Sequence, residues 1–181
     1  MQIGTPIDEY NFKLVNMYNL LENSVRVNVS ENTFLIQKGP NQKQRAQILY
    51  DIDRKFEYII KQLKPNEYVG SEQKMIYILK NTPHIFVELT NNTGFLGVNY
   101  PLGVKKTTSV SFGTDKKERA MGRVVFLTID PKYISKKRLE DLIIHELSHT
   151  LANHVRYRPD DHGKDFIAAE NIFKKIWTSY K

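Results

Sequence analysis

The sequence predicts an α+β fold in one domain, residues 1–181, and three observations lead to it. The length suits one domain with a sizeable core, and no stretch rich in proline, glycine and serine divides it. A composition of 40% hydrophobic and 26% charged residues is typical of a globular protein and argues against intrinsic disorder. Segments with a helical period and segments with an alternating period do not alternate along the chain as they do in α/β proteins.

The first ninety residues are expected to be mostly helical. Apolar residues recur there at steps of three and four, which is typical of helices with one buried face, and Pro65 ends the longest of these runs. The expected elements are a helix over 8–22, a strand or hairpin over 24–36, an amphipathic helix over 41–63, a helix over 71–80 capped by Ser71, and a short buried strand over 85–87.

The second half is expected to hold a small antiparallel sheet and two helices. Two runs of β-prone residues flank a charged stretch, and an apolar stripe with i, i+4 spacing follows Ser135, a residue type that favours helix N-caps. The expected elements are a loop or an irregular edge over 94–103 that contains Pro101, an antiparallel hairpin of strands 107–112 and 123–129 with a charged tip over 113–122, a helix after Ser135, and an amphipathic helix over 163–180.

Composition also limits where the protein acts and what it can bind. No apolar run approaches the ~20 residues of a membrane-spanning helix, and the first twenty residues do not resemble a signal peptide. We therefore expect an intracellular protein, in the cytoplasm or nucleus, with no membrane partner. The absence of cysteine excludes disulfide scaffolds, thiol nucleophiles and zinc sites built on cysteine, so that any metal must be held by His, Asp or Glu.

The strongest chemical signal is His145-Glu146-Leu147-Ser148-His149, an H-E-x-x-H motif within the helix after Ser135. Residues four apart lie one turn apart on the same helix face, so both imidazoles can reach one ion while Glu146 lies beside that face. Chance would produce roughly 0.01 such motifs in a chain of this composition. The motif predicts a zinc site with His145 and His149 as ligands and Glu146 as the catalytic base.

Catalytic zinc usually takes a third protein ligand, and several residues downstream of the motif could supply it. His162 is the favoured choice because it lies where a polar loop meets the last helix, so that the loop can fold back over the metal. His154 would be turned about 140° away on an uninterrupted helix and could serve only if the helix ended near Ala152. The remaining candidates are Glu170, Asp160 and Asp161, and the two aspartates could instead cap the last helix.

The stretch HELSHTLANHVRYRPDDHGKDF resembles the zinc helix and return loop of the SprT-like and WLM metalloproteases. In that pattern H-E-x-x-H is followed by a His that begins another helix, with a Phe four residues later, and these positions are His162 and Phe166 here. Gly163 matches the SprT-like form. The wider pattern HTxxNHxRxRxDDHGxDF is similar to WLM-like proteins of large DNA viruses. The resemblance covers about 22 residues at its most specific, and the first ninety residues match no family.

The resemblance implies a zincin-like domain, a Zn²⁺ cofactor and peptide-bond hydrolysis. A protease of this kind also needs an oxyanion donor, and Tyr157 or Arg158 could reach the site from the return loop. Its best-studied members degrade proteins crosslinked to DNA, and the viral relatives would place the protein in a virion or an infected host cell. The net charge of +7 is concentrated in residues 101–140, with ten Lys and Arg against four Asp and Glu. Basic residues over 105–138 could therefore bind DNA, or could form a solvated hairpin.

Two other functions are compatible with the same residues. The first is a catalytically inactive, zinc-stabilised structural or DNA-associated protein, although such a site has no need of Glu146. The second is a nucleic-acid-binding module with incidental histidines, which lacks support from a stacked aromatic platform or a DNA-binding motif. The leading prediction is a zinc metalloendopeptidase that acts on a protein substrate, with its oligomeric state left open.

Overall fold

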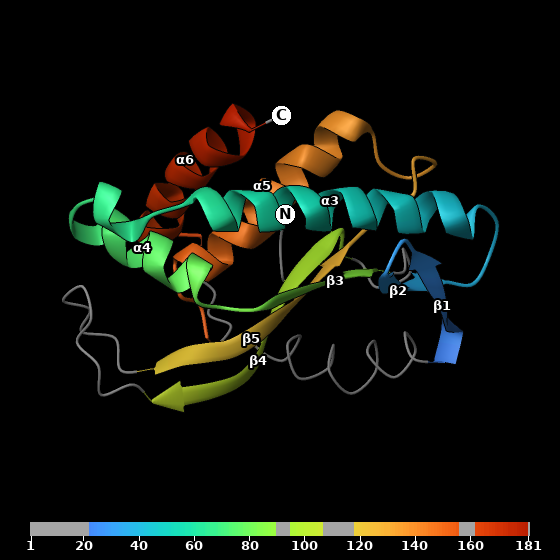
Figure 1. Cartoon of the computed structure of the whole chain (residues 1–181), viewed down its shortest axis with the longest axis horizontal. Coiled ribbons are helices and arrows are strands. Elements are labelled where there is room, and N and C mark those ends of the chain that lie inside the picture. The colour runs from blue at the N-terminus through green and yellow to red at the C-terminus, as the bar shows by residue number, and fades with distance from the viewer. Residues whose placement is uncertain (1–21, 90–94, 107–117, 156–161, 181) are drawn as a thin grey trace.

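The computed structural model describes residues 22–89, 95–106, 118–155 and 162–180. Two β-sheets and a layer of helices make up an α+β fold (Figure 1). The elements are β1 (Ser24–Val29), β2 (Asn32–Gln37), α3 (Gln42–Gln62), the 3₁₀ helix η2 (Pro65–Glu67), α4 (Gly70–Lys80), β3 (His84–Glu88), β4 (Gly97–Lys106), β5 (Glu118–Leu127), α5 (Lys136–Leu151) and α6 (Lys164–Ser179).

The main sheet has the strand order β3-β5-β4, with β5 parallel to β3 and antiparallel to β4. It is therefore mixed, and the prediction of a purely antiparallel sheet holds only for β4 and β5. The additional strand, β3, comes from the first half of the chain, and nothing local in its sequence specifies a partner more than thirty residues away. A second, two-stranded antiparallel sheet pairs β1 with β2, as the alternation over 24–36 predicted.

The segment 94–103, predicted as a loop or an irregular edge, is an edge and not a loop, because most of it forms β4. Pro101 and the glycines suggested irregular backbone, but β4 lies at the edge of the described sheet, where a missing N–H is tolerated. β5 likewise begins at Glu118, within the stretch predicted as a hairpin tip, because pairing with β4 extends to Lys106. The predicted strand 107–112 lies outside the described residues, as does nearly all of the predicted helix 8–22.

The other helix predictions agree closely with the structure. α3 and α6 occupy the predicted segments and bury the predicted apolar faces. The side chain of Ser135 caps α5 by accepting a hydrogen bond from the backbone N–H of Arg138 (3.2 Å). Ser71, however, is not the N-cap of α4: the helix begins at Gly70, whose φ of 59° is readily adopted by glycine, and Val69 is the N-cap.

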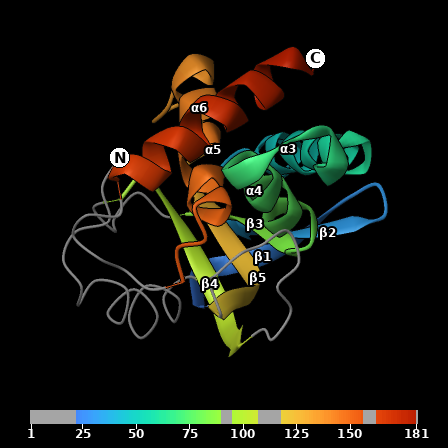
Figure 2. The ribbon, with the colours of Figure 1, turned by 90° about the vertical axis from the view of Figure 1, so that its left-hand side faces the viewer.

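The helices α3, α4, α5 and α6 lie on one side of the main sheet (Figures 1 and 2). The larger hydrophobic cluster fills the space between, with Phe86, Val125 and Leu127 from the sheet. Alternation along the strands sends Val98 and Phe126 to the opposite face, in a smaller cluster. The residues of β3, β4 and β5 that face the helices are therefore the ones that can meet α5.

Among the described residues no helix is long and apolar enough to cross a membrane.

Candidate metal centre

Helix α5 presents the H-E-x-x-H motif from a buried position. Leu142, Ile143 and Leu147 anchor the helix in the core, and they fix its rotation about its own axis. Glu146 is fully buried and His149 is 2% exposed, while His145 is partly exposed. The helix thus points the motif inward, toward the sheet on one side and α6 on the other.

Helix α6 brings the third histidine to this face of α5. His162 lies just before its N-cap, Gly163, and the ring of Phe166 lies one turn into the helix. The centroid of the Phe166 ring lies 5.0, 4.7 and 4.9 Å from those of His145, His149 and His162 respectively. The Phe166 ring therefore packs against all three imidazoles.

The three predicted ligands come together as one cluster. The ring centroids of His145 and His149 are 5.3 Å apart, and His162 lies 5.0 and 5.1 Å from them. One potential ligand atom from each residue lies within 4.8 Å of the others. His145, His149 and His162 are therefore close enough to bind a metal ion.

Two features of this cluster fit a metal. Nε2 of His149 and Nε2 of His162 are buried and have no hydrogen-bond partner among the described residues, which is costly unless a ligand satisfies them. Burial holds the pKa of His149 well below its usual value, with the nearby His154 and His145 acting in the same direction, and burial also lowers the pKa of His162. The imidazoles of His149 and His162 are therefore neutral at physiological pH, which is the form that binds metal.

The other predicted ligand candidates take different places. α5 ends at Leu151, which brings His154 back toward the cluster, but its Nδ1 lies 2.8 Å from Nδ1 of His149 rather than among the three potential ligand atoms. Oε2 of Glu170 lies 3.7 Å from Nδ1 of His145, a position suited to orienting that ring. Asp160 and Asp161 lie outside the described residues, as do Tyr157 and Arg158.

The carboxylate of Glu146 lies between α5 and β4. A Cβ atom built on Gly97 would come within 3.0 Å of Oε2 of Glu146 and 2.8 Å of Cδ1 of Leu142, so the strand passes directly over this side chain. Neither carboxylate oxygen makes a hydrogen bond of normal geometry with the described residues. Burial raises the pKa of Glu146 to about 8, an effect that the backbone amide of Asn99 partly offsets.

A buried polar network that the sequence did not predict ties α5 to the sheet. Nδ2 of Asn99, in β4, donates to the carbonyl oxygen of Glu146 (2.7 Å) and to Oγ1 of Thr150 (2.9 Å). Arg123, in β5 and only 2% exposed, donates to Oδ1 of Asn99 (3.2 Å) and to the carbonyl oxygen of His154 (2.8 Å). Asn99 and Arg123 are distant from the motif in sequence, so no local pattern points to them.

His84 of β3 completes the network, and its protonation follows from its partners. Nδ1 of His84 lies 2.7 Å from the carbonyl oxygen of Thr82, which only accepts, so Nδ1 carries the proton. Nε2 then accepts from the hydroxyl of Thr150 at 2.9 Å. Burial, followed by the charge of Arg123, lowers the pKa of His84 to about 3, which keeps this ring neutral.

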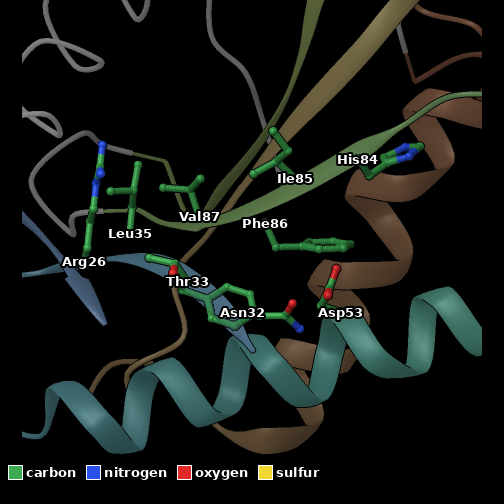
Figure 3. A pocket seen from close by; sticks show the side chains of 10 residues that line it. Arg26, Asn32, Thr33, Leu35, Asp53, His84, Ile85, Phe86 and Val87 are labelled. Atoms are coloured by element: carbon green, nitrogen blue, oxygen red, sulfur yellow. The ribbon is translucent and has the colours of Figure 1, made fainter. Parts of the chain in front are cut away.

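A separate pocket of about 380 Å³ lies beside β3, between that strand, β2 and α3 (Figure 3). Arg26, Asp53 and Ile85 are among its lining residues, and no member of the histidine cluster is. The pocket touches the network only through His84, which lines it and also contacts Thr150. It is therefore not the site at which the histidines would act.

The predicted basic surface is only partly described. Lys136, Lys137 and Arg138 are exposed at the start of α5, where Lys137 pairs with Asp141 (3.1 Å). The Arg119 guanidinium lies 5.8 Å from the centre of the Tyr77 ring instead of extending into solvent. Lys116 and Lys117 lie outside the described residues, and for Lys105 and Lys106 only the backbone of β4 is described.

Comparisons with models of protein families, with curated proteins and with solved structures find no match to this chain.

Proposed function

We propose that this protein is a zinc-dependent endopeptidase. The observation that carries the proposal is the convergence of His145, His149 and His162 beside a fully buried Glu146. A purely structural metal site has no use for a buried carboxylate next to its ligands, and burying that group without a partner is costly. Such a cost is typical of functional sites.

The donor set favours zinc. Three imidazoles with no thiolate and no carboxylate among the clustered donors suit Zn²⁺ better than Mg²⁺ or Ca²⁺, which prefer oxygen. Three protein ligands also match the usual catalytic arrangement, in which the fourth position is left for water or substrate. The SprT-like and WLM resemblance of the motif leads to the same metal.

The chain's own residues account for the proton transfers. When bound, zinc would act as a Lewis acid toward the scissile carbonyl and the attacking water. Glu146 would accept a proton from that water and deliver it to the departing amine. A carboxyl whose pKa is already raised is well suited to both roles, and the positive charge of a metal would bring that pKa back toward neutrality.

β4 is the candidate substrate platform. It lies at the edge of the described sheet, and Gly97 places its backbone against Glu146. An extended peptide that paired with this edge would run past the histidine cluster, with main-chain hydrogen bonds holding it. Because such pairing does not depend on side chains, it suits an enzyme that cleaves unfolded or partly unfolded proteins.

The test combines metal analysis with cleavage of casein. Wild-type protein should bind one equivalent of zinc and cleave casein, and Glu146→Gln should retain the zinc but lose cleavage. Glu140→Gln is the matched control, because Glu140 is on the same helix and more exposed, and its ion pair with Lys137 is long (3.9 Å). Full cleavage by Glu146→Gln would refute the proposal, and stoichiometric zinc without any cleavage would favour a structural metal protein.

Recruitment by DNA is a further arm of the same assay. Exposed cations at the start of α5 would contact the phosphates of DNA, and binding of this kind would weaken steeply as salt is raised. Histone cleavage with and without DNA would show whether DNA directs the protease to its substrates. Cleavage that is independent of DNA would leave these cations as a solvated surface.

A further inference from the structure

His154 is held against the metal cluster by the turn that ends α5. The backbone N–H of Ala152 donates to the carbonyl oxygen of Ser148 (2.9 Å), and that of His154 donates to the carbonyl oxygen of His149 (3.0 Å). Between them Asn153 adopts a left-handed conformation with φ of 59°, which asparagine tolerates better than most residues. Its side chain donates to the carbonyl oxygen of Glu118 (3.1 Å), and this contact fastens the turn to β5.

Arg123 fixes the same turn from the sheet side. Its guanidinium donates to the carbonyl oxygen of His154 (2.8 Å) and to Oδ1 of Asn99 (3.2 Å), and the residue is 2% exposed. A buried arginine with two such bonds has little freedom, because moving it would break charge-assisted hydrogen bonds in the interior. The backbone of His154 is therefore placed by β4 and β5 as well as by the end of α5.

If Nε2 of His149 binds the metal, the contact between His154 and His149 has a single arrangement of protons. Their Nδ1 atoms are 2.8 Å apart, so one of them must carry the proton that the other accepts. Nε2 of His149 is the buried atom without a partner among the described residues, and it can bind a metal only if it is unprotonated. The proton of neutral His149 then resides on Nδ1 and is donated to His154.

We propose that His154 is a positioning residue for the metal centre: its Nδ1 accepts the Nδ1–H of His149 and so fixes the tautomer and ring orientation that present Nε2 of His149 to the metal. This inference rests on the metal site of the proposed function. It gives His154 a role other than that of a metal ligand, because three histidines already supply the ligands. It also makes Arg123 the residue that ties His154 to the sheet. Partners of this kind typically contribute 10–100-fold to metal affinity.

Two substitutions separate the hydrogen bond from the ring. His154→Asn removes the ring but keeps an acceptor, because Oδ1 of asparagine occupies nearly the position of Nδ1 of histidine. His154→Phe keeps a ring beside Phe166, whose centroid lies 6.2 Å from that of His154, but offers no acceptor. Zinc affinity, measured by competition with a chromophoric chelator, should fall about 10–100-fold in His154→Phe and distinctly less in His154→Asn.

The outcomes distinguish this inference from the proposed function. Failure of wild-type protein to bind zinc would overturn both. The role of His154 alone would be overturned if wild type binds zinc and both variants bind it with wild-type affinity. It would also be overturned if both variants lose the same amount of zinc affinity. Urea unfolding of the metal-free variants checks that they are folded. If either is not, ¹H–¹⁵N NMR of zinc-loaded wild type decides, because a proton on Nδ1 of His149 is required and a metal bound there would overturn the inference.

Discussion

Gly97→Ala tests the placement of Glu146 against β4. The new Cβ would lie 2.8 Å from Cδ1 of Leu142, 3.0 Å from Oε2 of Glu146 and 3.1 Å from its Cγ. Both neighbours are buried, so neither side chain can swing into solvent. Overpacking of this kind costs about 1–3 kcal/mol, and the loss of glycine's freedom in the unfolded chain returns about 0.4–1 kcal/mol.

We therefore expect Gly97→Ala to lower the free energy of unfolding by about 1–2 kcal/mol in urea titrations. Because the displaced groups are Glu146 and Leu142, casein cleavage should fall by up to about 100-fold, while zinc affinity should change little. The cluster histidines are not among the three nearest atoms to the new Cβ, which is why binding and cleavage should separate.

Gly122→Ala is the matched control. Gly122 is also within a strand of the main sheet, but a Cβ there meets nothing closer than the carbonyl oxygen of Pro83 at 3.5 Å, an ordinary contact. This variant should keep wild-type cleavage and should gain about 0.4–1 kcal/mol in stability, because it loses glycine's freedom in the unfolded chain without a clash in the folded one. Equal stability and equal cleavage for Gly97→Ala and Gly122→Ala would refute the close packing of β4 on Glu146.

Three further predictions concern the elements that hold the site in place. Burial lowers the pKa of His84 from 6.5 to about 3, so between these pH values the unfolded chain binds more protons than the folded one. The stability that neutral His84 contributes is therefore present above pH 6.5 and is lost as pH falls, at up to ~1.4 kcal/mol per pH unit. Urea titrations between about pH 7 and about pH 4 should show a shallower loss for His84→Asn, and parallel profiles would contradict this assignment. Arg45→Met should cost about 3–5 kcal/mol because it strands Glu88, its buried ion-pair partner, and the double variant Arg45→Met/Glu88→Met should recover much of that loss; a double variant no more stable than the single would count against the pair. Ser135→Ala should cost about 1 kcal/mol in thermal or urea unfolding through loss of the N-cap of α5, and an unchanged midpoint would mean that the cap is not formed in solution.

The sequence predicted the helices of the site well because their signals are local. Apolar residues three and four apart define the buried faces of α5 and α6, and the four-residue spacing of His145 and His149 directs both rings to one side. The choice of His162 as third histidine agrees with the cluster in the structure. Its position next to a helix start limits where its side chain can lie, which is a local constraint as well.

The strands were predicted less well because a strand is completed by its partners. Pro101 and two nearby glycines made β4 resemble a loop or an irregular edge, and only pairing with β5 makes it a regular strand. β3 pairs in parallel with β5 across more than thirty intervening residues, and such a contact leaves no periodic mark in the sequence. The α+β class was confirmed, whereas the mixed character of the sheet was visible only in the structure.

The sequence by itself determined the chemistry that is available: histidines at helical spacing, a glutamate between them, a further histidine at the next helix, and no thiol to compete. Only the tertiary structure decided the surroundings of that chemistry. It placed Gly97 against Glu146, joined His84, Asn99 and Arg123 to α5, and set His154 beside His149. These contacts join residues far apart in the chain or across a helix end, where position depends on the packing of whole elements and not on any local pattern.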